Sequence, residues 1–86
     1  MPGQPERQTP TVASTIYQRR LVAGMERSDV AYAVGVTRRM VAYWEQDRSR
    51  PRLRHAKRLA SVLGGQTEDY LEVYYIDGFR QERDAG

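Results

Sequence analysis

Glycines divide most of this chain into short helical segments. Between Thr11 and Leu63 the apolar residues recur at spacings of three to five, which is typical of helices packed on one side. Four glycines, Gly24, Gly35, Gly64 and Gly65, stand where such a pattern ends and none of them falls inside one, as expected of residues that terminate helices. The first expected helix ends at Gly24 and the second at Gly35. The third runs from Thr37 to about Gln46 and the fourth follows Pro51 and ends at Leu63. The fifth begins near Thr67. No strand-like alternation of useful length is present, so an all-α domain of five short helices is predicted.

The size and composition of the chain exclude several classes of protein. Its 86 residues suffice for one small domain. There is no cysteine and only one histidine, His55, which excludes a disulfide framework, a thiolate zinc site and a Cys/His catalytic pair. We expect no metal, no cofactor and no small-molecule ligand. The apolar runs are too short to span a membrane, and no apolar signal region opens the chain, so a cytoplasmic location is expected.

The polar ends of the chain differ from its middle. Residues 1–10 contain three of the four prolines and no apolar period, which predicts a flexible, disordered arm. Residues 11–76 form the expected folded domain. Residues 77–86 form an acidic tail that could contribute to a dimer interface.

The joint between the second and third expected helices is the most informative segment. Only Gly35, Val36 and Thr37 separate them, and so tight a turn needs a residue that tolerates positive φ, which Gly35 supplies. Ala31 is small enough to let the next helix cross closely. Apolar residues at Val30, Val34, Val36, Val41 and Trp44 would pack the two helices together. This pattern predicts a helix-turn-helix.

The stretch RSDVAYAVGVTRRMVAYWEQDRSRP resembles the Cro/repressor-type, lambda-repressor-like helix-turn-helix family of DNA-binding domains. The shared features are a small residue, a Gly turn, Val-Thr, an aliphatic-x-x-Trp-Glu pattern and a later Pro. The resemblance runs from about Ala13 through Leu71 and includes a Leu-Ala-x-x-Leu helix. Four positions depart from the family pattern. Glu26 and Arg27 stand where a Ser/Thr cap and Gln are usual, Asp47 stands where Gly often ends the third helix, and Gly65 stands where Val usually follows the fourth helix.

The resemblance implies that the third helix lies in the major groove of double-stranded DNA. Val41 and Trp44 would point inward by helical geometry, so that the outward residues become candidates for base contacts. These candidates are Arg38, Arg39, Ala42 and Tyr43. Arginine can grip guanine O6 and N7 with two hydrogen bonds. Contact of Arg38 and Arg39 with phosphates alone is the alternative.

Phosphate contacts are expected on either side of that helix. The candidates are Arg27, Thr37, Arg48, Arg50, Arg52 and Arg54. Six basic residues fall between positions 48 and 58, which independently favours an anionic partner. A merely solvated basic face is the alternative, with Lys57 and Arg58 as bystanders. The resemblance also implies a structural ion pair between Glu45 and Arg20, with Arg19 as the substitute.

The last segment carries more aromatic surface than a terminal helix needs. Tyr70 and Leu71 would finish the core, whereas Tyr74, Tyr75, Ile76 and Phe79 could form a dimer face. The alternative is that these four side chains fold back on the first helix. The charge is also uneven: the total of +3 combines a net +7 over residues 19–58 with a net −4 over residues 67–86.

These features together predict a transcriptional regulator without enzymatic activity. It would bind a two-fold operator as a homodimer, with half-sites about 34 Å apart. An architectural or excisionase-like DNA-binding protein is one alternative, and an antitoxin or adaptor that uses the same fold for protein interaction is another. No nucleophile–base pair, phosphate loop or metal-ligand spacing favours an enzyme.

Overall fold

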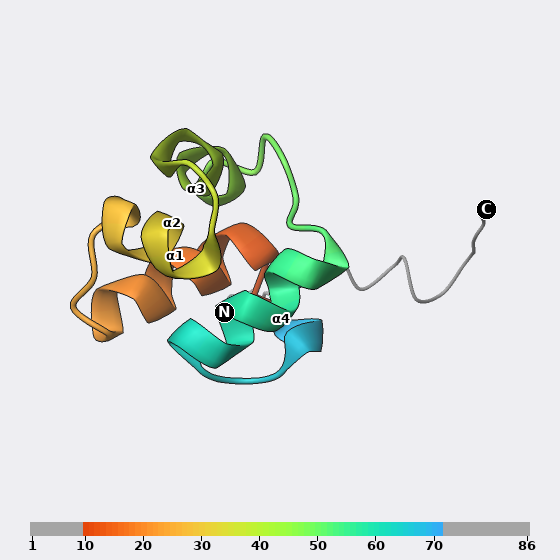
Figure 1. Ribbon diagram of the computed structural model, residues 1–86. Helices are drawn as coiled ribbons and strands as arrows, with labels where there is room; N and C mark the ends of the chain where they lie inside the picture. Colours follow the sequence, from red (N-terminus) through yellow and green to blue (C-terminus); the bar gives the residue numbers. More distant parts are fainter. Residues whose placement is uncertain (1–9, 72–86) are drawn as a thin grey trace, which may run out of the picture.

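The computed structural model describes residues 10–71, which form four α-helices and one 3₁₀ turn (Figure 1). The α-helices are α1 (Val12–Val22), α2 (Arg27–Val34), α3 (Arg38–Glu45) and α4 (Leu53–Leu63), and the 3₁₀ turn η2 covers Thr67–Tyr70. No strand occurs within these 62 residues. The all-α prediction is therefore confirmed for the described part of the chain.

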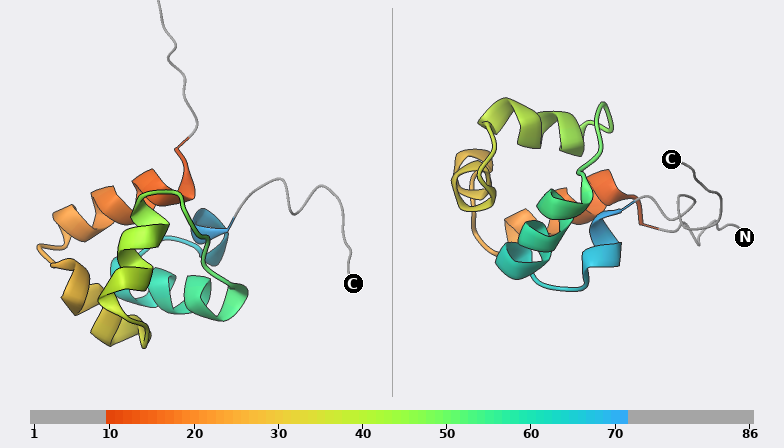
Figure 2. Two further views of the ribbon diagram at one scale, coloured as in Figure 1. Left: turned by 90° about the horizontal axis from the view of Figure 1, so that it is seen from above. Right: turned by 45° about the vertical axis from the view of Figure 1, so that its right-hand side comes forward.

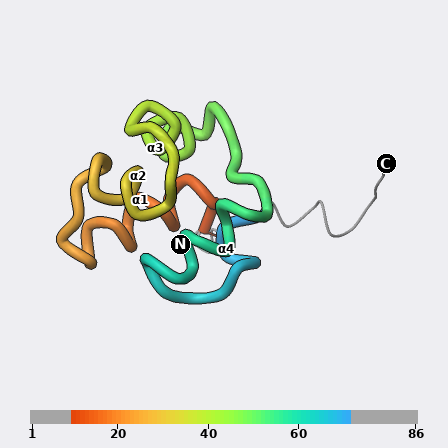
Figure 3. The backbone as a smooth tube through the Cα atoms, viewed as in Figure 1, coloured from red at the N-terminus to blue at the C-terminus, as the bar shows by residue number. Residues whose placement is uncertain are grey.

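The helices surround a single core. α2 packs against both α3 and α4, whereas α1 packs against α3, α4 and η2. The views in Figure 2 and the backbone trace in Figure 3 show α3 on one side of the molecule and η2 on the other, with α1 and α4 between them. A long connection follows α3 and leads to α4.

The expected fifth helix is the main difference from the predicted element count. The segment that begins at Thr67 is a 3₁₀ turn that ends at Tyr70, because Leu71 already has extended backbone angles (φ −118°, ψ 151°). Three sequence predictions fall outside the described residues. They are residues 1–9 of the expected arm, the acidic tail, and the dimer-face candidates Tyr74, Tyr75, Ile76 and Phe79.

The helix starts are set by short-range capping. Thr11 and Ser14 cap α1 reciprocally, each accepting the other's backbone N–H at 3.0 Å. Glu26 precedes α2 in place of the usual Ser or Thr. Asp29 compensates, because its carboxylate accepts the backbone N–H of Glu26 at 2.8 Å.

The core is small and draws on every helix. Its largest fully buried side chains are Trp44, Tyr70, Ile16, Leu59, Val30 and Val41. A large apolar residue of α1, Leu21, lies outside the core. Leu21 is 49% exposed and Arg20 is buried, because Arg20 lies on the face of α1 that meets α3. Leu53, the first residue of α4, is also exposed.

Arg19 holds the C-terminal turn against α1. Its Nη1 donates to the Gly64 carbonyl at 3.1 Å, to Asp69 Oδ2 at 3.0 Å and to the Tyr70 hydroxyl at 3.1 Å. The Tyr70 hydroxyl itself donates to the Gly64 carbonyl at 2.7 Å. Gly65 follows with φ +85°, and a Cβ there would collide with the Arg19 guanidinium and the Asp69 carboxylate. Arg19 is therefore committed to this turn and does not substitute for Arg20.

Candidate nucleic-acid interface

The turn between α2 and α3 fixes how α3 is presented. Gly35 has φ +90°, and the backbone N–H groups of Gly35 and Val36 both donate to the Ala31 carbonyl, at 2.8 and 2.9 Å. This left-handed residue ends α2 and turns the chain directly into α3. Thr37 then caps α3, with its hydroxyl oxygen accepting the Met40 N–H at 3.1 Å.

One carboxylate links three helices behind this turn. Arg20 of α1 donates from Nε to Glu45 Oε2 at 2.7 Å and from Nη2 to Oε1 at 3.1 Å. Arg27 of α2 donates from Nε to Glu45 Oε1 at 3.0 Å. The Glu45 side chain is 1% exposed, and its hydrogen bonds raise the pKa of Arg20 above the ordinary arginine value. Arg20 also donates to the Met25 carbonyl, so the loop before α2 is fixed as well.

Arg27 takes part in this cluster although the sequence pattern indicated only a phosphate contact. Only its Nε is bonded to Glu45, and its side chain remains 30% exposed. A guanidinium carries five N–H groups, so the outer ones remain available to an anion. The ion pair thus orients Arg27 rather than withdrawing it.

The outer face of α3 combines exposed and partly covered residues. Arg38 and Arg39, the first two residues of the helix, are exposed, whereas Ala42 and Tyr43 are half-buried. Trp44 is 1% exposed and belongs to the core, as its spacing predicts. Arg48 places its guanidinium carbon 4.8 Å from the centre of the Tyr43 ring. This cation–π contact, which the sequence analysis missed, joins the helix face to the basic loop.

The loop after α3 carries the remaining basic candidates. Arg48, Arg52 and Arg54 are exposed, and Arg50 forms an ion pair with Asp47 at 3.2 Å. Asp47 adopts φ +62°, the left-handed conformation that the family's usual glycine would favour. The basic loop therefore begins with a strained residue that turns the chain away from α3.

The electrostatic effect of these arginines is visible at His55. Its ring stacks at a tilt against Trp44, with centroids 5.6 Å apart. Burial lowers the pKa of His55 below its ordinary value, and the positive charges of Arg54, Arg52 and Arg58 lower it further. A group of cations that disfavours an additional proton is suited to a negatively charged ligand.

Residues 16–71 match the helix-turn-helix family, and the matched region contains all four elements just described: the turn, the carboxylate cluster, the face of α3 and the basic loop. The chain belongs to the Cro/repressor-type helix-turn-helix family. Searches of the curated proteins and of the solved structures found no match.

Members of this helix-turn-helix family are DNA-binding regulators and are not typically enzymes. The chain is accordingly a DNA-binding regulator of this type. Within residues 10–71 no helix has the length and apolar character needed to cross a membrane. The same residues contain no group of three or more metal-binding side chains.

Proposed function

We propose that this helix-turn-helix protein is a sequence-specific transcriptional regulator that reads the major groove with α3. The observation that supports this most is the position of Arg38 and Arg39. Both are exposed in the first turn of a helix that packs against α1 and α2, and neither forms an ion pair with another described residue. Such arginines are free to form bidentate hydrogen bonds with guanine.

Ala42 and Tyr43 would complete the base-contacting face. Ala42 lies one turn beyond Arg38 and Arg39 on the same helix. Its small side chain would allow α3 to approach a thymine methyl closely. Tyr43 would present its hydroxyl at the edge of the groove, held there by the guanidinium of Arg48.

Phosphates would be contacted from both ends of α3. Before the helix, Thr37 would use its hydroxyl or the neighbouring free amides, and Arg27 would use its outer N–H groups. After the helix, Arg48, Arg50, Arg52 and Arg54 would lie along the backbone. Because these contacts carry no sequence information, they would position α3 rather than select the site.

The protein would bind a two-fold operator as a homodimer in the bacterial or phage-infected cytoplasm. Two copies related by a two-fold axis would place two α3 helices in successive major grooves, about 34 Å apart. Tyr74, Tyr75, Ile76 and Phe79 are the proposed dimer face, because aromatic and apolar side chains are enriched at such interfaces.

Selection of bound fragments from a random DNA pool would test this function. We expect an enriched motif with two-fold symmetry and at least one guanine in each half-site. The variant Arg38→Ala/Arg39→Ala should lose about tenfold or more in preference for that motif over random DNA. Lys57→Ala, which removes an exposed cation from α4, is the matched control and should keep the preference.

The salt dependence of binding separates the phosphate contacts from the base contacts. Affinity should fall steeply as salt rises, and removal of Arg52 should reduce the slope of log affinity against log salt by about one. An enriched motif without symmetry, or strong DNA bending without any motif, would favour an architectural role. A folded Arg38→Ala/Arg39→Ala variant that keeps full DNA preference would refute groove reading by α3.

A further inference from the structure

A small cationic notch lies where α4 meets the end of α2. It is a cavity of about 210 Å³ lined by Val34, Gly35, Arg54, His55 and Arg58. Arg54 and Arg58 are four positions apart on α4, so they lie on the same face of that helix. None of the five lining residues is acidic. The proposed DNA contacts use only Arg54 of this notch.

The charges of the two arginines are not neutralised within the described residues. Both side chains are exposed, and neither forms an ion pair there. Arg58 lies against the turn before α3, since a methyl group on Gly35 would stand 3.8 Å from its Nη1. No basic residue occupies the last turn of α2, so Arg58 also faces the negative end of that helix. A helix end carries only about half an elementary charge, so it positions the guanidinium without neutralising it.

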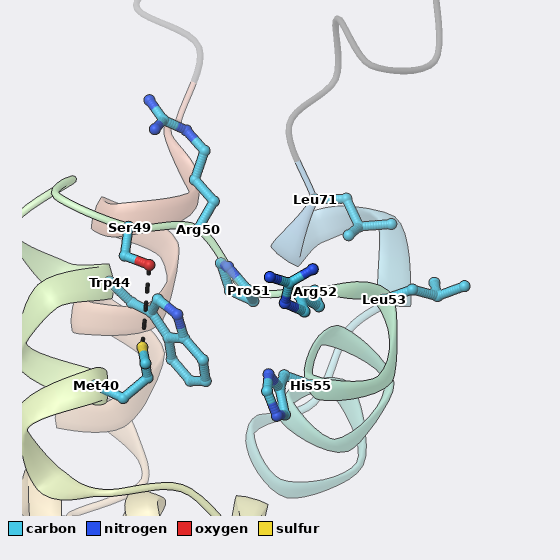
Figure 4. Close-up of a pocket in the computed structure, with 9 residues that line it drawn as sticks. All are labelled: Met40, Trp44, Ser49, Arg50, Pro51, Arg52, Leu53, His55 and Leu71. Carbon is cyan, nitrogen blue, oxygen red and sulfur yellow. Dashed lines mark hydrogen bonds between the residues drawn. The ribbon is translucent and has the colours of Figure 1, made fainter. Parts of the chain in front are cut away.

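His55 borders the notch on a third side. It also lines the larger cavity of about 580 Å³ beside α3, where its ring lies against Trp44 (Figure 4). Burial lowers the pKa of His55, and the charges of Arg54, Arg52 and Arg58 lower it further. The residues that α3 and the end of α2 place in these two cavities carry no charge: they are Met40, Trp44, Val34 and Gly35.

We propose that this notch binds a phosphate group, held by the guanidinium groups of Arg54 and Arg58 and bordered by the ring of His55. Two separate guanidinium groups suit a tetrahedral phosphate, because each can pair with different oxygens. A carboxylate has only two oxygens, which a single guanidinium fork already satisfies. A bound anion would also offset the repulsion that the neighbouring cations exert on a proton at His55.

The phosphate can come from the DNA backbone or from solution. The notch adjoins the turn that leads to Thr37 and the first turns of α4, so it lies between the two groups of proposed phosphate contacts. With DNA as the source, the inference rests on the proposed function and adds Arg58 to its contacts. The alternative of a solvated basic face leaves Arg58 as a bystander.

The ring of His55 reports on the notch. It is the only histidine, so its NMR signals give its pKa without ambiguity. A duplex of the selected sequence should raise this pKa towards the ordinary value, because a phosphate in the notch favours the imidazolium. Arg58→Gln should remove most of that rise. Lys57→Gln, which removes a neighbouring exposed cation outside the notch, should keep it, and equal rises in the two variants would overturn the inference.

Neutral methylphosphonates, placed one at a time along the duplex, would locate the contact. At one position the replacement should weaken binding of the wild type about tenfold and abolish the rise in the His55 pKa. The same replacement should weaken binding of Arg58→Gln about threefold or less, because that variant already lacks the partner. Lys57→Gln should show the full wild-type loss.

Inorganic phosphate, titrated without DNA at constant ionic strength, tests the second source. A saturable rise in the His55 pKa that Arg58→Gln abolishes would support the notch with free phosphate as its ligand, even if the methylphosphonate scan finds no coupled position. The absence of both a coupled position and a saturable rise would refute the notch.

These outcomes are separate from those of the proposed function. If Arg38→Ala/Arg39→Ala loses its motif preference and neither assay responds to Arg58→Gln, the notch is refuted while groove reading by α3 stands. If the chain selects no DNA motif, the proposed function fails and the titration with inorganic phosphate decides the notch alone.

Discussion

Arg20 and Glu45 join α1 to α3 through two hydrogen bonds, although 25 positions separate them in the chain. Both side chains are buried, with 9% and 1% of their surface exposed. The pair is therefore a positional constraint: it fixes the end of α3 against a helix that contributes nothing to the predicted base contacts. A buried ion pair of this kind specifies geometry more than it adds net stability.

Neutralising Glu45 should destabilise the fold strongly. Glu45→Gln keeps the shape of the side chain but leaves Arg20 buried without its counter-charge, which costs about 3–5 kcal/mol when a buried pair is broken. Small domains have only about 5–15 kcal/mol of stability in total. Urea denaturation would measure the loss. The control Glu68→Gln, at an exposed glutamate in η2, should change the free energy of unfolding little.

The two glycines after α4 should respond differently to alanine. Both have positive φ, so either substitution costs about 1 kcal/mol or more through backbone strain. Only at Gly65 would the new methyl group also displace Arg19 from Asp69, whereas the space beside Gly64 is open. The melting temperature of Gly65→Ala should therefore fall below that of Gly64→Ala. Equal melting temperatures would show that the Arg19 contacts adjust without cost.

Replacing Asp47 by glycine should stabilise the protein. Asp47 holds φ +62°, a conformation that costs an L-residue about 1–2 kcal/mol and glycine almost nothing. The ion pair with Arg50 that the substitution removes has an exposed carboxylate and contributes little. A gain of about 1 kcal/mol would raise the melting temperature by about 4–8 °C. Asp47→Ala, which keeps the strain and loses the pair, should not be stabilised.

The stability of the fold should depend on His55 in mildly acidic solution. Burial, assisted by Arg54 and Arg52, lowers the pKa of the folded histidine below 6.5. As the pH falls through about 6.5 the unfolded chain takes up a proton that the folded chain still refuses, so stability is lost as the solution is acidified. Chemical denaturation at about pH 7.5 and about pH 5.5 should show this loss, and His55→Gln should reduce it. An identical loss in His55→Gln would assign the effect to another group.

The features that depend on neighbouring residues could be read from the sequence. Gly35, the Thr37 cap and the burial of Trp44 each follow from local spacing or from the needs of one turn. The family itself was also recognisable, because its motif lies within a continuous stretch that the family match covers.

The features that depend on rotation about a helix axis could not be read from the sequence. Arg19 and Arg20 are adjacent arginines in the last turn of α1, and only their angular positions decide that one meets Gly64 and the other Glu45. The same holds for Leu21, which lies outside the core although its spacing fits. The sequence predicted a helix from Thr67, but the segment is only the short turn η2. Its first residues are helix-like, and the backbone becomes extended at Leu71.

The adjacency of Arg19 and Arg20 also has a consequence for regulation. One holds the turn from which the chain continues past Leu71, and the other holds the end of α3. A displacement of α1 therefore disturbs both attachments together. A partner that shifted α1 by binding the C-terminal turn would therefore be expected to change the affinity of α3 for its ligand, and by thermodynamic reciprocity the ligand on α3 would change the affinity for that partner by the same factor.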